Sequence, residues 1–390
     1  MKVKIKSNPE DFIVKEAASL DLKDKGDFGV YLLEKRGWNT VDLLLRLSRE
    51  LGMPFKDFSY AGRKDRHGLT FQHITIKGPR RAEVKEKDYS LRFLGFMDRP
   101  MGPDLIAGNG FEIAVRGLGE EEARRGLEAI EVVRRMGYPN YFDEQRFGSF
   151  DPRQGFFAEK VLKGHFEGAL KIHLALKGHF RGDLKTDLAL KGHFTGALKT
   201  DLAVAKAGPG KASCDPLARG PKAALALLRK IPRDELAMYF ASYQAYVWNE
   251  VLRRIIKSIP GLALQSYKGS AGDYLFYTGP EEKDCRYLKD LVLPACAGKT
   301  KMPDELSAGI YGSVLEENGI KPAMFNKLKL RQAFFKAFPR PAVVKPVGLE
   351  FEVRDDGASP GKKKLSLRFS LPRGSYGTML VKRLFSFNRI

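Results

Sequence analysis

The 390-residue chain has few cysteines and no long apolar run. Its three cysteines, Cys214, Cys285 and Cys296, form no Cys-x-x-Cys pair, and their odd number fits reduced thiols better than a disulfide framework. The sequence contains no stretch of about 18 apolar residues, which excludes a membrane-spanning helix. Residues 1–16 are too charged for a secretory signal peptide. We therefore expect a cytoplasmic protein with no membrane partner.

Negative charge is scarce relative to positive charge. The chain has 68 lysines and arginines against 47 aspartates and glutamates, which gives a net charge of +21 and a pI near 9.7. Such an excess favours a polyanionic partner, of which nucleic acid is the commonest, although a chain can also be basic only for solubility. With 43% hydrophobic and 11% aromatic residues the chain is not disordered, and its length predicts two domains.

The two ends of the chain combine strand patterns with helix patterns. Apolar and polar residues alternate at 12–16 and 365–371, which predicts strands with one buried face. Between Thr40 as the N-cap and Gly52 as the stop, leucines recur at helical spacing. Residues 120–137 predict a second helix, because acids open it and bases close it. This pattern is typical of an α+β fold.

The middle of the chain has a different texture. Three near-copies of a 14-residue segment, at 162–175, 176–189 and 190–203, each predict an amphipathic helical segment from large apolar residues spaced by four. Residues 234–259 give the strongest helix pattern of the chain.

Similar ends around a different middle indicate a discontinuous domain that carries an inserted one. The predicted core domain comprises residues 1–155 and 341–390 and contains a mixed, mostly antiparallel sheet with flanking helices. The inserted domain at 156–340 is predicted to be an α-rich α+β domain, with the tandem repeat at 162–203. A cleft between the two would receive the partner.

A basic loop at 60–72, YAGRKDRHGLTFQ, carries one aspartate between two predicted extended segments. Four basic residues surround Asp65: Arg63, Lys64, Arg66 and His67. In one reading the loop is a β-turn whose aspartate bonds to its own backbone. In the other, the basic neighbours keep the carboxylate ionised and hold an anionic substrate. The residues alone leave both readings open.

Two further segments have compositions that suit RNA. Residues 139–155 interleave aromatic and basic side chains, and unpaired bases stack on aromatic faces while phosphates pair with arginine. A packed turn with snorkelling arginines would have the same composition. Residues 371–384 place a Gly-rich turn before a helix-like end; its backbone N–H groups could hold a phosphate, which is a weak signal by itself.

Five segments of the chain, in order, are similar to the signature segments of one enzyme family. They are SNPEDFIVKE at 7–16, NT at 39–40, YAGRKDRHGLT at 60–70, NYFDEQRFG at 140–148 and RFSLPRGSYGT at 368–378. Together they resemble the TruD family of tRNA pseudouridine synthases, over roughly half of the chain. The resemblance is weaker between about 156 and 340, where that family carries its own inserted domain.

The resemblance implies roles for individual residues. Asp65 matches the catalytic aspartate that pseudouridine synthases share, and Lys6 matches an active-site lysine of the family. Phe142 matches a phenylalanine that would stack on the target base. The residues expected to contact RNA lie in the signature segments: Arg63, Lys64, Asn140, Arg146, Arg373, Ser375 and Tyr376.

The implied reaction is the isomerisation of uridine to pseudouridine, by resemblance at position 13 of tRNA. The N1–C1′ bond breaks, the base turns and C5 bonds to C1′, so the reaction requires neither a metal nor a cofactor. Asp65 would attack C1′ or remove a ribose proton; both routes need its ionised form, and Lys6 beside it would hold its pKa down. The target base must be flipped out of a folded RNA. We expect a monomer that binds tRNA or another structured RNA.

Two other classes of function are alternatives. A metal hydrolase is suggested by His165, His179 and His193, but their regularity follows from the repeat and no known metal-ligand spacing is present. We expect no metal site, and we expect the histidines in and between the repeat copies to lie at the surface. A non-catalytic RNA-binding or ribosome-associated factor on the same fold would explain the charge but gives no reason for Asp65.

Overall fold

The computed structural model describes residues 5–178, 220–278, 282–330, 332–386 and 388–389. The chain divides into two compact units. The first unit comprises Met1–Asn140 and Val343–Phe387, and the second comprises Tyr141–Ala342 with Asn388–Ile390. The domain boundaries predicted from the sequence lie after residues 155 and 340, and the catalytic role of the discontinuous part stays a prediction.

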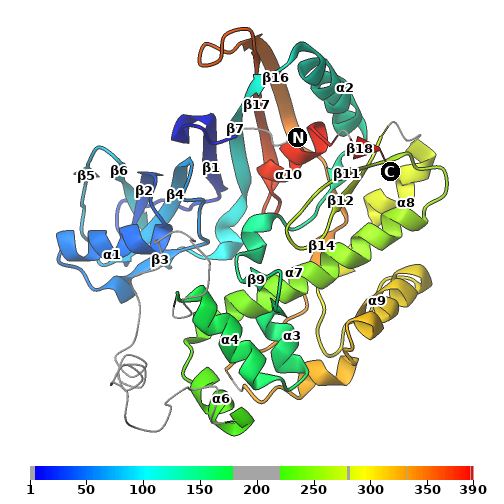
Figure 1. Cartoon of the computed structure of the whole chain (residues 1–390). Helices are drawn as coiled ribbons and strands as arrows, with labels where there is room; N and C mark the ends of the chain where they lie inside the picture. Colours follow the sequence, from blue (N-terminus) through cyan, green and yellow to red (C-terminus); the bar gives the residue numbers. More distant parts are fainter. Residues whose placement is uncertain (1–4, 179–219, 279–281, 331, 387, 390) are drawn as a thin grey trace, which may run out of the picture. The chain divides into compact units, whose positions relative to one another are not determined.

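The first unit is built on a nine-stranded sheet (Figure 1). In spatial order its strands are β16 (Val347–Asp355), β17 (Lys363–Pro372), β7 (Ile106–Leu118), β1 (Phe12–Ala18), β4 (Leu69–Lys77), β2 (Phe28–Arg36), β6 (Tyr89–Met97) and β5 (Val84–Lys85), with β3 (Phe58–Tyr60) paired to β4. Among the described strands of this sheet, only β1 and β4 pair in parallel. The predictions of strands at 12–16 and 365–371, and of a mixed, mostly antiparallel sheet, are confirmed.

The parallel pairing of β1 and β4 decides which chain segments meet. Parallel neighbours begin at the same edge of a sheet, so the segments that lead into β1 and β4 approach each other there. The segment before β1 contains Lys6, and the segment before β4 contains Asp65. Gly68 permits the close approach, because a Cβ at this position would lie 2.4 Å from the carbonyl oxygen of Phe12.

Helix α1 (Thr40–Glu50) packs its leucines against core residues of β2, β4 and β6. Asn39 is the N-cap residue and Thr40 is the first helical residue, so the predicted cap is wrong by one position. The backbone at Asn39 is extended while that at Thr40 has already entered the helix, which leaves the Thr40 hydroxyl available for other partners. Gly52 follows the helix with a φ of +62°, a conformation that glycine adopts without strain, and it ends the helix as predicted.

Two more helices belong to the first unit. Helix α2 (Glu120–Met136) packs against β17, and α10 (Gly377–Leu384) packs against α2. As predicted, α2 carries glutamates in its first turn and arginines in its last, where they complement the helix dipole.

The chain leaves the first unit through β8 (Tyr138–Pro139) and returns to it through β15 (Val343–Val344). These two short strands pair antiparallel, with Tyr138 opposite Val344. The exit and the return are therefore hydrogen-bonded neighbours.

The second unit is rich in helices, among which α7 (Arg233–Ser258) is the longest of those described (Figure 1). The helix predicted at 234–259 is confirmed, and α3 and α9 pack against it. The other described α-helices and strands of this unit are α3 (Phe157–Leu162), α4 (Phe166–Leu176), α6 (Gly220–Leu228), α8 (Glu282–Asp290), α9 (Glu305–Glu317), β9 (Phe150–Asp151), β10 (Gly155–Phe156), β11 (Leu264–Tyr267), β12 (Tyr274–Tyr277), β13 (Val292–Pro294), β14 (Pro339–Pro341) and β18 (Asn388–Arg389). Across the described part of the chain, no helix is long and apolar enough to cross a membrane.

The first copy of the repeat, 162–175, covers the end of α3 and most of α4, so its predicted helical character is confirmed. The copies at 176–189 and 190–203, with His179 and His193, lie outside the described residues except for 176–178.

His165 is exposed as expected, but the surface interpretation is wrong for His173, which is 3% exposed. Its Nδ1 lies 3.1 Å from the hydroxyl of Tyr239 and 3.3 Å from a carboxylate oxygen of Glu235, both on α7. These polar partners make the burial of the imidazole tolerable.

Candidate active site

Asp65 and Lys6 form an ion pair at the sheet edge where β1 and β4 begin. The Lys6 ammonium donates to Asp65 Oδ2, and the backbone N–H of His67 donates to Oδ1 at 3.0 Å. The Lys6 and Asp65 side chains are 19% and 16% exposed. The structure thus brings these two predicted site residues into contact, while their catalytic roles stay predictions.

The surroundings of Asp65 favour its ionised form. Burial of the carboxyl group raises its pKa, but the charge and hydrogen bond of Lys6 and the backbone N–H of His67 outweigh that effect. The pKa of Asp65 is therefore lower than the ordinary value of 3.8. At neutral pH this position presents a negatively charged oxygen that remains partly accessible to a ligand.

The segment that carries Lys6 is held from several sides. Lys6 itself has a φ of +64°, an unusual conformation for a residue other than glycine, and its Nζ lies 4.2 Å from the centroid of the Phe12 ring. The turn that follows is fixed by Asp11, which accepts from the backbone N–H of Asn8 at 3.0 Å and from Arg116 at 2.8 Å. The contact between Lys6 and Asp65 is therefore part of an ordered arrangement.

Lys64, the residue before Asp65, has a mostly buried side chain that is 11% exposed. Its Nζ lies 2.7 Å from Asn109 Oδ1 and 2.7 Å from Glu16 Oε1, and the second oxygen of Glu16 accepts from the backbone N–H of His73 at 2.8 Å. Burial raises the pKa of Glu16, but His73 and Lys64 together lower it below 4.5. The expected contact of Lys64 with RNA stays a prediction that this arrangement disfavours, because the ammonium already has partners within the first unit.

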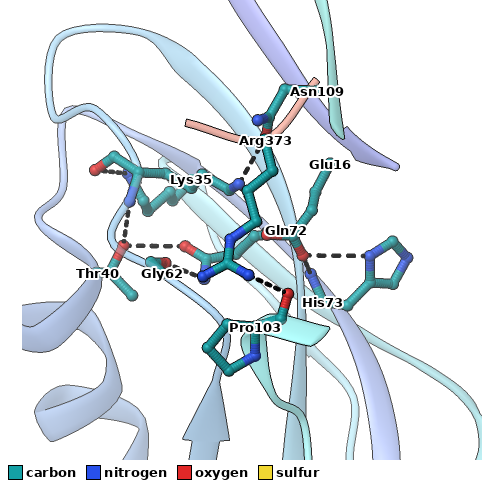
Figure 2. Close-up of polar contacts among 10 residues, drawn as sticks. Glu16, Lys35, Thr40, Gly62, Gln72, His73, Pro103, Asn109 and Arg373 are labelled. Carbon is teal, nitrogen blue, oxygen red and sulfur yellow. Dashed lines mark hydrogen bonds and ion pairs between the residues drawn. The ribbon is translucent and has the colours of Figure 1, made fainter. Parts of the chain in front are cut away.

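The other residues of the first unit that were expected to contact RNA differ in exposure. Arg63 and Arg373 are exposed, and Arg373 donates to the carbonyl oxygen of Pro103 at 2.8 Å (Figure 2). The remaining three are Asn140 at 4%, Ser375 at 9% and the half-buried Tyr376. Of this set, the two arginines can offer charge to a phosphate in the arrangement described.

Phe142 and Arg146 belong to the second unit, where the phenylalanine is surrounded by arginine and aromatic groups. The guanidinium carbon of Arg340 lies 4.0 Å from the centroid of the Phe142 ring, and that of Arg146 lies 5.7 Å from it. The rings of Trp248 and Phe338 make edge contacts with Phe142, with centroid distances of 5.5 Å and 6.4 Å. Phe142 is 4% exposed, so the predicted stacking platform is covered, and Arg340 lies over its ring.

One residue that binds the Asp65 loop from within lies outside the signature segments and was not predicted from the sequence. Lys35 on β2 is fully buried and donates to the backbone carbonyl oxygen of Asp65 at 2.7 Å. One signal in the sequence could have revealed it, because Tyr31, Leu33 and Lys35 are alternate residues of one strand. A lysine that occupies a position of the buried face indicates a specific polar partner.

The comparisons with known proteins agree with the resemblance that the sequence indicated. The family model for tRNA pseudouridine synthase D (TruD) matches residues 1–384. The relatives include tRNA pseudouridine synthase D of Aquifex aeolicus, 31% identical over 99% of this chain and 98% of the relative, and that of Leptospira interrogans, 29% identical over 99% and 97%.

Among solved structures, the crystal structure of a TruD protein from Methanosarcina mazei matches with a TM-score of 0.67 and 26% identity, over 99% of this chain and 94% of that one. These relatives lend no support to the alternative of a non-catalytic RNA-binding factor. The match of the family model to nearly the whole chain shows that this protein belongs to the TruD family of tRNA pseudouridine synthases.

Proposed function

We propose that this protein converts a uridine of tRNA, at position 13, to pseudouridine, with Asp65 as the catalytic carboxylate. The observation that carries the proposal is the ion pair of Asp65 with Lys6, which keeps a partly accessible carboxylate ionised. Membership of the TruD family supports the reaction and the class of RNA.

The reaction needs an ionised carboxylate at its first step. Asp65 would attack C1′, or would remove a ribose proton, and the N1–C1′ bond breaks as the electron pair leaves with the base. The base then turns and C5 bonds to C1′, while the proton on C5 is lost and N1 gains one. In the first route the bond between Asp65 and C1′ breaks as C5 bonds to C1′; in the second route Asp65 returns the proton to the ribose, so the atoms balance in both. Lys6 would lower the free energy of the charged carboxylate through its ion pair with Asp65.

Two features support the proposed binding of a flipped base: the exposed arginines of the first unit, and the aromatic cluster of the second unit. Arg63 and Arg373 would pair with phosphates, which are the dominant source of affinity for RNA. Phe142 would supply an apolar wall for the detached base once RNA binding displaces Arg340 from its covered ring, and Arg340 and Arg146 are cationic planes that can themselves stack on bases. A wall of this kind restrains the base without hydrogen bonds that would stop its rotation.

The test is the replacement Asp65→Asn, which keeps the size of the side chain and removes its charge. With tRNA labelled with tritium at C5 of uridine, we expect tritium release to fall by at least about a thousandfold while binding of tRNA is retained. Asp88→Asn, at an exposed position, is the matched control and should leave the rate unchanged. Full tritium release by Asp65→Asn would refute the proposed role of this carboxylate.

The position of the uridine can be tested separately. A tRNA with cytidine at position 13 should bind normally and release no tritium, and pseudouridine mapping of wild-type product should show a single site. Product at another position would keep the proposed chemistry and refute the proposed site. The proposal also takes the enzyme to act as a monomer in the cytoplasm, which sedimentation and fractionation would check.

A further inference from the structure

We propose that Lys35 is a positioning residue for the reaction, one that sets the place of Asp65 by binding the backbone of its loop and does not touch the RNA. This inference rests on the proposed function of Asp65. It assigns work to a buried cation on β2 that neither the family signature segments nor the ion pair with Lys6 involves.

All three N–H donors of the Lys35 ammonium group have a hydrogen-bond partner. Its Nζ donates to the carbonyl oxygens of Asp65 at 2.7 Å and Trp38 at 2.8 Å, and lies 3.4 Å from that of Lys64. A lysine has three N–H donors, and three backbone carbonyl groups meet them here. Two of those carbonyls belong to the Asp65 loop and one to the connection between β2 and α1, so Lys35 ties the two segments together.

A second set of contacts holds the same loop from the side of α1 (Figure 2). The Thr40 hydroxyl accepts from the backbone N–H of Lys64 at 3.1 Å and donates to Gln72 Oε1 at 2.9 Å. Gln72 in turn donates to the carbonyl oxygen of Gly62 at 3.4 Å. Backbone groups of Gly62, Lys64 and Asp65 are therefore fixed by side chains from β2, α1 and β4, while the Asp65 carboxylate is left for Lys6 and the substrate.

The burial of a charge at this position argues for a specific purpose. An unpaired ammonium in a protein interior is costly, and an apolar residue would fill this face of β2 more cheaply, as Tyr31 and Leu33 do along the same strand. The cost is offset only while the backbone carbonyls stay in place around Nζ. The buried ammonium needs these carbonyl groups in order to be stable, and in the same way its presence stabilises the loop conformation that supplies them. In this conformation Asp65 is directed towards Lys6.

The experiment compares Lys35→Met with Lys77→Met in the full-length protein. Methionine keeps the length and apolar stem of lysine and removes the donors, and Lys77 is an exposed lysine on the neighbouring strand β4. We expect Lys35→Met to lower kcat for tritium release from tRNA by about 10- to 100-fold with KM within a factor of about two, because a displacement of order 1 Å at a reacting group has effects of this size. Lys77→Met should keep the wild-type kcat.

Thr40→Val serves as a second variant that keeps the buried lysine. It removes the hydroxyl that accepts from the Lys64 backbone, and we expect a fall in kcat of about 3- to 10-fold, again with KM unchanged. An unaltered kcat in both Lys35→Met and Thr40→Val would overturn the proposal, even if both variants are less stable. Wild-type turnover that persists in Asp65→Asn would instead contradict the proposed function.

The pH dependence of kcat separates positioning from mere stabilisation. Burial lowers the pKa of Lys35 to about 8, against the opposing effect of Asp65. Above this pH the neutral amine has two N–H donors for three carbonyls, so kcat of the wild type should fall with a midpoint near pH 8. The charged or titratable groups that face Lys35 are Asp65 and Lys64 in the loop, Tyr89 opposite it on β6, and Arg46 of α1, which stacks on Trp38 and Tyr89.

Two of those neighbours, Asp65 and Tyr89, have pKa values that are shifted away from pH 8. The pKa of Asp65 lies below 3.8, that of Tyr89 is raised above 10 by burial, and the position opposite Lys35 on β4 is the uncharged Thr70. The alkaline fall in kcat should therefore be absent from Lys35→Met. An identical alkaline profile in wild type and Lys35→Met would overturn the proposal.

Discussion

Replacement of Gly68 by alanine is expected to separate Lys6 from Asp65 and so to slow the reaction. Gly68 is the residue before β4, and a Cβ at this position would lie 2.4 Å from the carbonyl oxygen of Phe12, the first residue of β1. Ordinary contacts of this kind begin near 3.4 Å, so the two backbones must separate by about 1 Å. The obstacle is backbone rather than the end of a flexible side chain, and therefore it cannot simply rotate away.

The separation acts on the place where the two reactive side chains meet. Overpacking of a buried site by one methyl group costs about 1 to 3 kcal/mol in unfolding free energy. A displacement of about 1 Å between reacting groups can cost about a hundredfold in rate. We therefore expect Gly68→Ala to lower the unfolding free energy by about 2 kcal/mol and kcat by about a hundredfold, with tRNA affinity nearly unchanged.

Urea unfolding and tritium release from tRNA measure the two effects. The control is Gly357→Ala, at a turn between β16 and β17 where a Cβ meets no atom within 4 Å. This variant should be as stable as the wild type or more stable by about 0.5 kcal/mol, because alanine restricts the unfolded chain. If Gly68→Ala keeps both the wild-type unfolding free energy and the wild-type kcat, the close approach of β1 and β4 does not set the geometry of the site.

Three further predictions concern charge. Lys6→Met removes the cation that lowers the pKa of Asp65, so this pKa should rise. Because the reaction needs the ionised carboxylate, the fall of kcat on the acid side of the pH profile should then occur at higher pH. An unchanged profile on the acid side would contradict the pairing of Lys6 with Asp65. His173→Asp places a second carboxylate beside Glu235, and urea unfolding should show a loss of about 3 kcal/mol in unfolding free energy. The control His165→Asp, at the exposed N-cap of α4 where an aspartate is favoured, should not lower the unfolding free energy. Arg63→Ala should reduce the slope of log affinity for tRNA against log salt concentration by about one; an unchanged slope would exclude a phosphate contact.

Local patterns in the sequence predicted the elements whose two faces differ most. The alternation at 12–16 gave β1, the leucines after Thr40 gave α1, and the acids and bases at 120–137 gave α2. The sequence analysis assigned no strand between 78 and 118, yet β6 and β7 lie inside the sheet. Glycines interrupt the alternation of apolar and polar residues in both strands. The two strands are buried by neighbouring strands that are distant in sequence, which no local pattern indicates.

The candidate site shows the same limit. Its central pair was expected only because the segments resembled a family, since no local pattern places Lys6 beside a residue 59 positions further along the chain. The roles of Lys35 and Glu16 depend on which strands are neighbours, and that order is set by long-range pairing. The repeat led to a different error. His173 stands where the other copies have aspartates at 187 and 201, and it is buried although it was expected at the surface together with the other histidines of the repeat.

The ladder between β8 and β15 has a consequence for the evolution of the chain. The residues between β8 and β15 form an insertion, and the two strands pair with each other at its ends. The insertion therefore leaves and re-enters the first unit at fixed points, and its length can change without moving the sheet. Tandem duplication inside such an insertion adds little to the entropic cost of bringing its two ends together, because that cost grows only with the logarithm of the length of the insertion. The arrangement of Lys6 and Asp65 in the first unit could therefore stay constant while 14-residue units accumulated in the insertion. In sequence, the repeat lies more than a hundred positions after Lys6 and nearly as far after Asp65.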